Sequence, residues 1–143
     1  MSKKVIIIGG GFGGVYTARH LLHFGFDVIL ISDRNYFTFT PMLHEIATGG
    51  LAVGDIIFEY ESFFKNSHFS FIRGKVKNID CENHSVLVDD LVLQGDFLVI
   101  ATGSKSRRFD IQGIENTTEL KNIDDAKKIK KKIIELALSL IHI

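Results

Sequence analysis

Apolar and polar residues along the first 33 positions follow an order that predicts a strand, a turn, a helix and a second strand. Val5–Ile8 is an unbroken β-branched run, which is typical of a strand buried on both faces of a parallel sheet. A glycine-rich stretch follows, and apolar residues then recur at helical spacing up to Gly25, a residue suited to ending a helix. Asp27–Ile31 is a second apolar run. We therefore expect a βαβ unit over residues 4–33.

Further strands are predicted beyond this unit. Residues 69–72 and 97–101 are apolar runs of strand length, and the alternation in 75–80 and 85–88 predicts an antiparallel hairpin. The whole pattern predicts an α/β fold with a parallel sheet and a small antiparallel hairpin layer.

The last predicted element is an amphipathic helix from Asp124, its expected N-cap, to Leu140. The five lysines within residues 127–132 are interpreted as its solvated face. Its apolar stripe requires a surface to bury against, and we expect a further strand to follow it.

Composition narrows the classes of function. The chain has 143 residues, a length that suits one domain, and 17 basic and 17 acidic residues balance to a formal net charge of zero. This balance argues against a nucleic-acid-binding protein, which would carry a clustered basic face. We see no secretory signal and no run near the roughly 18–20 apolar residues of a membrane span, so we expect a cytoplasmic protein. The single cysteine, Cys81, is expected to lie in a surface turn and excludes a cysteine-pair redox centre.

The glycine-rich turn carries the strongest motif in the chain. Gly9, Gly11 and Gly14 have GxGxxG spacing, and they follow a buried strand and open a helix. In that setting the first glycine permits a tight turn, the second lets a pyrophosphate approach, and the third lets helix and strand pack closely. The free N–H groups and the positive helix end favour the anion. The motif predicts a Rossmann-like site for the ADP part of a dinucleotide.

Asp33 extends this prediction. It lies 19 residues beyond Gly14, at the end of the second strand, where a carboxylate hydrogen-bonds a ribose hydroxyl. An acid at this position disfavours NADP, because it repels a 2′-phosphate. The neighbouring Arg34 weakens that exclusion slightly.

Two further segments lie at the expected ligand-binding edge of the sheet. Residues 35–50 form an aromatic-rich stretch with a short helix predicted near Met42–Thr48, and its apolar walls suit a flat ring system. Ala101-Thr102-Gly103 ends a strand with small residues that allow close approach of a ligand.

With these residues in view, the sequence resembles the N-terminal part of the type II NADH dehydrogenases, FAD-containing NADH:quinone oxidoreductases of the pyridine nucleotide-disulfide oxidoreductase superfamily. The resemblance spans about residues 3–130. It is carried by residues 5–14, 35–50, 73–80 and 98–104, of which 35–50 is the most specific.

This resemblance implies FAD as the cofactor. It implies pyrophosphate contacts along the turn from Gly9 through Gly10, Gly11, Phe12 and Gly13 to Gly14. It implies ribose contacts at Ser32 and Asp33, an adenine contact at Val76, and a path beside the flavin nucleotide at Ala101, Thr102 and Gly103. Thr40, Pro41 and Thr48 would lie near the flavin ring.

The resemblance also implies what the chain would be. Residues 1–143 correspond to an FAD-binding domain, without the NADH-binding domain and the C-terminal membrane-binding region of the family. We expect NADH and quinone to be partners of a full-length enzyme only, which in this family is peripheral on the inner face of the membrane. A truncated reading frame would explain the end of the sequence. No residue here is expected to act as a catalytic acid, base or nucleophile, and no metal site is expected.

Two alternatives remain open. One is a non-catalytic module that holds FAD or another adenine dinucleotide, or that pairs with a separate NADH-binding chain or with itself. The other is an NAD-dependent dehydrogenase domain. A short-chain dehydrogenase is disfavoured, because Tyr60 and Lys65 are five residues apart where that class needs four.

Several candidate residues have simpler interpretations. His20 and His23 have a spacing that suits a metal, but we expect two solvated histidines. His44, beside Glu45, is expected to pack or hydrogen-bond rather than act in acid–base chemistry. Phe12 is expected to pack rather than to stack on a substrate.

Overall fold

The computed structural model describes residues 2–107 and 109–141. The chain forms two compact units. The first comprises Met1–Phe37 and Phe58–Gly103, and the second comprises Thr38–Ile57 and Ser104–Ile143.

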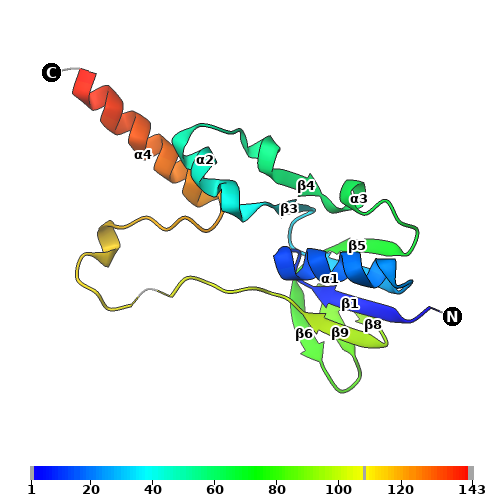
Figure 1. Ribbon diagram of the computed structural model, residues 1–143. Helices are drawn as coiled ribbons and strands as arrows, with labels where there is room; N and C mark the ends of the chain where they lie inside the picture. The colour runs from blue at the N-terminus through cyan, green and yellow to red at the C-terminus, as the bar shows by residue number, and fades with distance from the viewer. Residues whose placement is uncertain (1, 108, 142–143) are drawn as a thin grey trace. The chain divides into compact units, whose positions relative to one another are not determined.

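The first unit is built on a four-stranded parallel sheet. Its strands are β1 (Lys4–Ile8), β2 (Asp27–Ser32), β5 (Phe69–Arg73) and β9 (Phe97–Ile100), in the spatial order β5-β2-β1-β9. Figure 1 labels β1, β5 and β9 of this sheet, with α1 beside them. All three neighbouring pairs are parallel. The predicted parallel sheet is therefore confirmed, except that β9 ends at Ile100 rather than at Ala101.

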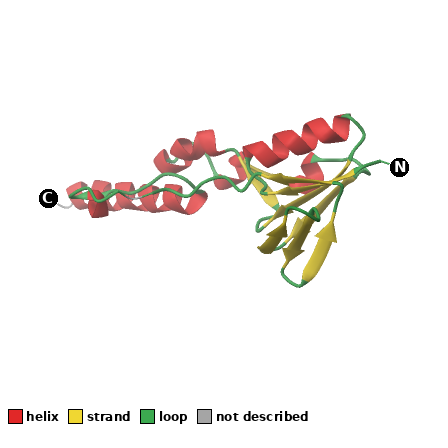
Figure 2. Ribbon diagram, turned by 90° about the horizontal axis from the view of Figure 1, so that it is seen from below, coloured by secondary structure: helices red, strands yellow, loops and turns green. Residues whose placement is uncertain are grey.

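Alternate residues of β1 supply two separate cores, because successive side chains point to opposite faces of a sheet. Val5 and Ile7 pack with the apolar face of α1 (Phe12–His23). Ile6 and Ile8 pack with residues of an antiparallel sheet on the other face. Figure 2 shows the helix and the antiparallel strands on opposite sides of the parallel sheet.

The antiparallel layer has three strands, so the predicted two-stranded hairpin is incomplete. Its strands are β6 (Val76–Asp80), β7 (Ser85–Val88) and β8 (Leu91–Gln94). Val88 pairs with Leu91, which leaves Asp89 and Asp90 as a two-residue turn. Asp89 has φ +50°, a left-handed conformation that aspartate tolerates better than most residues. The pattern did not predict β8, because Leu91-Val92-Leu93 is a short apolar run without the alternation of a half-buried strand, and in the structure Val92 is 67% exposed.

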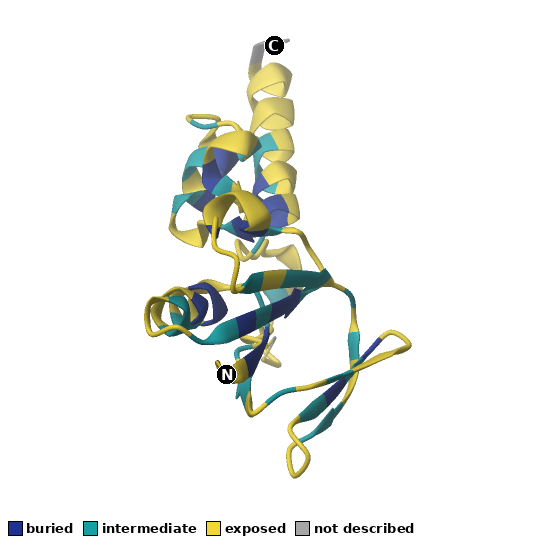
Figure 3. Cartoon of the chain, turned by 90° about the vertical axis from the view of Figure 1, so that its right-hand side faces the viewer, coloured by how far each residue is buried: buried dark blue, intermediate teal, exposed yellow. Residues whose placement is uncertain are grey.

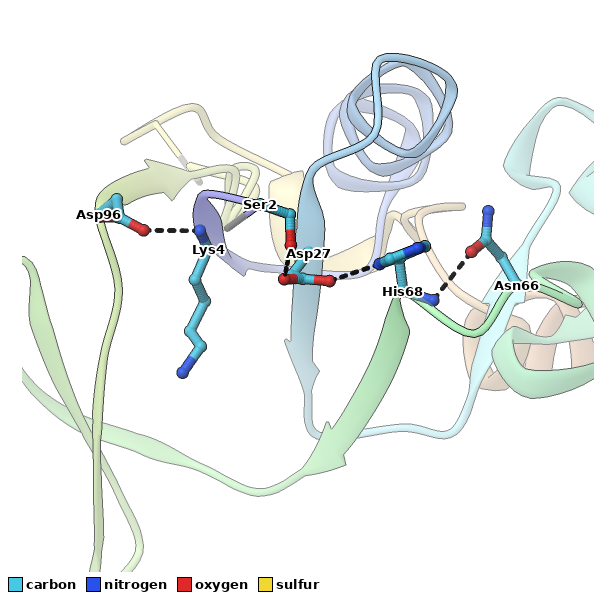
Figure 4. Close-up of polar contacts among 6 residues, drawn as sticks. All are labelled: Ser2, Lys4, Asp27, Asn66, His68 and Asp96. Carbon is cyan, nitrogen blue, oxygen red and sulfur yellow. Dashed lines mark hydrogen bonds and ion pairs between the residues drawn. The ribbon is translucent and has the colours of Figure 1, made fainter.

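Polar contacts join the beginnings of the four parallel strands (Figure 4). The Asp27 carboxylate accepts a hydrogen bond from the Ser2 hydroxyl and contacts His68 Nδ1 at 2.6 Å. The backbone N–H of Lys4 donates to the Asp96 carboxylate at 2.7 Å. These contacts link β1 to β2 and β9, and β2 to the residue before β5, so they fix the strands at the edge opposite their carboxyl ends.

The boundary between the units falls within a pair of short strands, β3 (Tyr36–Thr38) and β4 (Ile57–Glu59). After β4 the chain returns to the first unit through α3 (Tyr60–Phe63).

The described residues of the second unit form two α-helices and three 3₁₀ turns. The short helix α2 (Leu43–Thr48) packs against α4 (Ile123–Ile141). The 3₁₀ turns are η1 (Thr40–Met42), η2 (Val53–Ile56) and η3 (Ile114–Asn116). The predicted short helix near residues 42–48 is thus confirmed.

The helix α4 begins one residue before the predicted N-cap. The Asp125 N–H donates to the Asn122 side chain at 2.9 Å, and the Asn122 N–H donates back to the Asp125 carboxylate at 3.2 Å. Asn122 and Asp125 therefore form a reciprocal cap, and the prediction of Asp124 was wrong. Sequence reading chose the wrong residue because three residues suited to capping, Asn122, Asp124 and Asp125, stand within four positions.

Burial along α4 is uneven. Ile123 and Ala126 are buried, whereas every residue from 131 to 140 is exposed, including Leu136 and Leu140 (Figure 3). Within residues 2–107 and 109–141, no helix combines the length and apolar character that a membrane crossing requires.

The contacts of Asp27 generate a pH-dependent prediction. Its hydrogen bond from Ser2, and then its contact with His68, hold the pKa of its carboxyl below the ordinary value of 3.8. A carboxyl with a lowered pKa contributes stability above its unfolded-state pKa, and that stability is lost as the pH falls through the folded-state pKa. We expect Asp27→Asn to lower the urea midpoint at pH 7 by a small amount, and the difference from wild type to vanish in strong acid.

Asp110→Asn, at an exposed loop position, is the matched control. Equal urea midpoints for wild type and Asp27→Asn at pH 7 would show that the contacts of Asp27 do not stabilise the sheet.

Candidate dinucleotide-binding site

The glycine turn lies at the carboxyl edge of the parallel sheet, between the end of β1 and the start of α1. The Gly9 N–H donates to the Ile31 carbonyl at 2.8 Å, and the Ala101 N–H donates to the Ile8 carbonyl at 2.8 Å. The turn is therefore flanked by the ends of β2 and β9, where open α/β sheets bind their ligands.

Three glycines of the turn have no room for a side chain. A Cβ on Gly9, which has φ +108°, would lie 2.3 Å from the Ala101 carbonyl oxygen. A Cβ on Gly14 would lie 1.8 Å from the Gly9 carbonyl oxygen, and one on Gly10 would lie 1.9 Å from the Tyr60 hydroxyl. The third motif glycine, Gly14, thus allows the start of α1 to pack directly on the residue that follows β1, and the first, Gly9, allows the turn to approach the segment that follows β9.

Gly11 faces open space, in contrast to these three. A Cβ there would meet no atom within 4 Å, and the backbone has φ −81° and ψ −167°. Gly11 is the N-cap of α1, and no side chain caps the helix. The first N–H groups of a helix have no acceptor within it, and the helix dipole adds positive charge there. This uncapped helix end, with room beside it, fits an anionic pyrophosphate.

Ser32 and Asp33 lie at the end of β2, as predicted. The backbone of Asp33 is held by a hydrogen bond from Arg73 Nε to its carbonyl at 3.3 Å. Its side chain is exposed, and within the described part of the chain no hydrogen bond or ion pair engages its carboxylate. Asp33 is therefore available to accept hydrogen bonds from a ribose.

The other predicted residues of the first unit also have defined places. Ala101, Thr102 and Gly103 follow β9, and Gly103 has φ +72°. Val76 opens β6, two residues after Gly74, whose N–H donates to the Ser32 carbonyl at 3.0 Å. The start of β6 is thereby held close to the end of β2.

Thr40, Pro41 and Thr48 lie in the second unit, in η1 and at the end of α2. The Thr48 hydroxyl donates to the His44 carbonyl at 3.0 Å, and His44 Nδ1 bonds the Pro41 carbonyl at 2.9 Å. His44 Nε2 also lies 3.4 Å from the Glu45 carboxylate. The expected hydrogen-bonding role of His44 is confirmed.

Tyr60 is the residue of this region that sequence reasoning missed. Its side chain is 1% exposed, and its hydroxyl donates to the Gly10 carbonyl at 2.7 Å. Burial raises the pKa of its phenol above the ordinary 10.0, and a hydrogen bond with Ser32 partly offsets this increase. Its place in an apolar stretch signalled burial, but nothing in the sequence linked it to a turn 50 residues away.

The simpler interpretations of four other residues are confirmed. Phe12 packs edge-on against Phe37 with ring centroids 4.9 Å apart, and Cys81 is exposed in the turn after β6. His20 and His23 are exposed on α1, where they line a shallow hollow of about 620 Å³. Among the described residues, no group of His, Cys, Asp and Glu side chains could hold a metal ion.

The chain is similar in sequence to known oxidoreductases. Residues 3–141 match the family model described as pyridine nucleotide-disulphide oxidoreductase. The chain is 35% identical over 142 residues to a probable NADH dehydrogenase of Dictyostelium discoideum, covering 94% of this chain and 32% of that protein. It is 31% identical over 136 residues to a type II NADH:quinone oxidoreductase of Staphylococcus haemolyticus, covering 92% of this chain and 34% of that protein.

Two solved structures agree with these matches. The sulfide:quinone oxidoreductase of Aquifex aeolicus superposes with a TM-score of 0.85 at 34% identity, over 96% of this chain and 33% of that one. NDH2 of Plasmodium falciparum, solved in complex with NADH, gives a TM-score of 0.80 at 30% identity, over 99% of this chain and 30% of that one. The chain thus spans about a third of the length of these relatives.

The contact between Gly14 and Gly9 predicts the effect of one added methyl group. Gly14→Ala forces a Cβ against a backbone carbonyl, so we expect it to lower the free energy of unfolding by about 1–3 kcal/mol. Gly13→Ala is the matched control, because its Cβ would make only an ordinary 3.7 Å contact with Ala101. Urea unfolding of both variants without ligand gives the comparison, and equal stability would show that the close approach is unnecessary.

Proposed function

The chain belongs to the pyridine nucleotide-disulphide oxidoreductase family, and from this premise we propose that it is the FAD-binding part of an NADH:quinone oxidoreductase-like flavoprotein. The observation that carries the proposal is the uncapped N-terminus of α1, with open space at Gly11 and the end of β2 beside it.

The ADP part of FAD fits the chemistry of the first unit. A pyrophosphate needs N–H donors and positive potential, and the helix end supplies both without a charged side chain. The adenosine ribose needs an acceptor for its hydroxyl groups, and the exposed Asp33 carboxylate is such an acceptor. We assign the backbone of residues 9–14 to the pyrophosphate, and Ser32 and Asp33 to the ribose.

The remaining contacts rest on family resemblance together with position. Val76 stands near the end of β2 through the Gly74 hydrogen bond, which supports its assignment to the adenine. Ala101, Thr102 and Gly103 continue from the strand next to the glycine turn, which supports a place beside the rest of the nucleotide. Thr40, Pro41 and Thr48 are assigned to the flavin end by resemblance alone.

When bound, FAD would supply the redox chemistry, which is hydride transfer from NADH and electron transfer to a quinone. This chain's contribution is to bind and orient. Its backbone donors hold the diphosphate, its Asp33 carboxylate holds the ribose, and its tightly packed turn keeps these groups fixed relative to one another. This proposal needs no general acid or nucleophile from residues 1–143.

The names of the relatives favour quinone as the final acceptor. They include NADH dehydrogenases, NADH:quinone oxidoreductases and a sulfide:quinone oxidoreductase. The NADH-linked names are the more numerous among the relatives described above, so we propose NADH as the electron donor.

Direct binding tests the proposal. The purified chain, incubated with FAD and passed through a desalting column, should retain flavin absorbance. Gly11→Ala should still fold, because its backbone is extended and its Cβ meets nothing, and the poorer N-cap should cost at most about 1 kcal/mol. The added methyl group would project where the diphosphate binds, so we expect the FAD dissociation constant to rise about tenfold or more.

Gly54→Ala is the matched control, since a Cβ there also meets nothing within 4 Å and the residue lies in η2. A colourless protein that binds NAD instead of FAD would favour the dehydrogenase alternative. Unchanged FAD affinity in Gly11→Ala would remove the glycine turn from the site.

Activity of the chain alone provides a second test. The sequence has one GxGxxG turn, and we assign it to FAD, which leaves no second turn of that kind for NADH. We therefore expect no NADH oxidation above background when the FAD-loaded chain is mixed with NADH and a water-soluble quinone. The decrease in NADH absorbance measures this, and sustained turnover would contradict the assignment.

A further inference from the structure

Tyr60 connects two parts of the proposed FAD site, and neither the motif nor the family resemblance assigned it a role. It is the first residue of α3 and the largest fully buried side chain in the described part of the chain. All of its contacts discussed below are made within the first unit.

The Tyr60 hydroxyl lies where the glycine turn meets the end of β2. It donates to the Gly10 carbonyl at 2.7 Å. The Ser32 hydroxyl lies beside the same phenol, and a side-chain hydrogen bond between the two partly offsets the increase in the Tyr60 pKa that burial causes. Both hydroxyl groups lie close to Gly10. A Cβ added to Gly10 would lie 1.9 Å from the Tyr60 oxygen and 3.1 Å from Ser32 Oγ. Three groups from distant parts of the sequence therefore converge there.

The contact with Tyr60 explains why position 10, which the GxGxxG motif does not specify, is glycine. Position 10 is unspecified in the spacing Gly9-x-Gly11-x-x-Gly14, and yet it is glycine here. Any side chain at position 10 would displace the Tyr60 hydroxyl. The position of Tyr60 is therefore by itself a sufficient reason for glycine at position 10.

The hydrogen bond also sets the direction of a neighbouring donor. The peptide between Gly10 and Gly11 is planar and trans, so its C=O and N–H point in opposite directions. Because Tyr60 holds the Gly10 carbonyl, the Gly11 N–H is directed away from Tyr60. Gly11 is the residue whose surroundings are open.

Tyr60 is itself fixed in place. Its N–H donates to the Asn35 carbonyl at 3.1 Å, and its carbonyl accepts from the Phe64 N–H at 2.8 Å. Its ring packs on Phe71 of β5 with centroids 5.0 Å apart. Because both its backbone and its ring are held, Tyr60 can keep the turn in a single conformation.

We propose that Tyr60 is a positioning residue that fixes the Gly10–Gly11 peptide and the Ser32 hydroxyl together for the ADP part of the dinucleotide. The inference rests on the proposed FAD-binding function. It adds that the site is organised by a residue that reaches the turn only because the chain folds back after β4.

The test is Tyr60→Phe, which keeps the ring packing and removes the hydroxyl. We expect the dissociation constants of ADP and of FAD to rise by a similar factor, about five- to tenfold, because the peptide and Ser32 lose a shared partner. Tyr16→Phe is the matched control, since it removes the same group from a side chain that is 57% exposed. Isothermal titration calorimetry measures both ligands.

A spectroscopic readout separates positioning from a general loss of stability. In nitrogen-15 NMR of the ligand-free chain, Tyr60→Phe should shift the Gly10 and Gly11 amide signals while leaving those of the β6–β8 sheet in place. In the wild-type chain, titration with ADP should move the Tyr60 ring signals together with the Gly11 amide. This second measurement needs no variant and holds even if Tyr60→Phe does not fold.

The outcomes distinguish the two proposals. Equal ADP and FAD affinities in wild type and Tyr60→Phe would overturn the role of Tyr60 and leave the proposed function standing. The role of Tyr60 would likewise be overturned if ADP shifted the NMR signal of the Gly11 amide but not the signals of the Tyr60 ring. Failure of the wild-type chain to bind either ligand would overturn both proposals.

Discussion

The first unit depends on the close contact between the beginning of α1 and the end of β1. Gly14 lies against the Gly9 carbonyl with no space for even one carbon atom between them. This approach brings the helix onto the sheet so that Val15 and Ala18 reach Val5 and Ile7. It also directs the helix N-terminus to the edge where β2 and β9 end, so the same contact builds the core and the candidate site.

The two edges of the parallel sheet are organised by different kinds of interaction. At the beginnings of the strands, side chains such as Asp27, His68 and Asp96 satisfy one another and the backbone. At the carboxyl ends, the turn carries glycines and no side chain caps α1. Polar groups are therefore hydrogen-bonded within the protein at the beginnings of the strands, and backbone donors are left for a ligand at the carboxyl ends. Ligand binding requires this distribution.

The buried faces of β1 hold these edges in place. Ile6 and Ile7 are fully buried on opposite sides of the sheet, and burial of such a side chain contributes about 1.5–3 kcal/mol. The antiparallel layer covers one of these sides through Val86 and Val88. It also carries Val76 next to the end of β2, so a layer that stabilises the sheet also contributes a candidate contact to the site.

The sequence by itself determined the βαβ unit, the parallel strands, the glycine turn and the place of Asp33. These features depend on local periodicity and on glycine conformations, which neighbouring residues fix. The third strand of the antiparallel layer, the Asn122 cap and the role of Tyr60 were decided only by tertiary structure. Tyr60 bonds to Gly10 across 50 residues, and the GxGxxG spacing leaves position 10 unspecified. Hydrogen bonds between distant segments leave no periodic trace in a sequence, because they depend on how separate elements pack together.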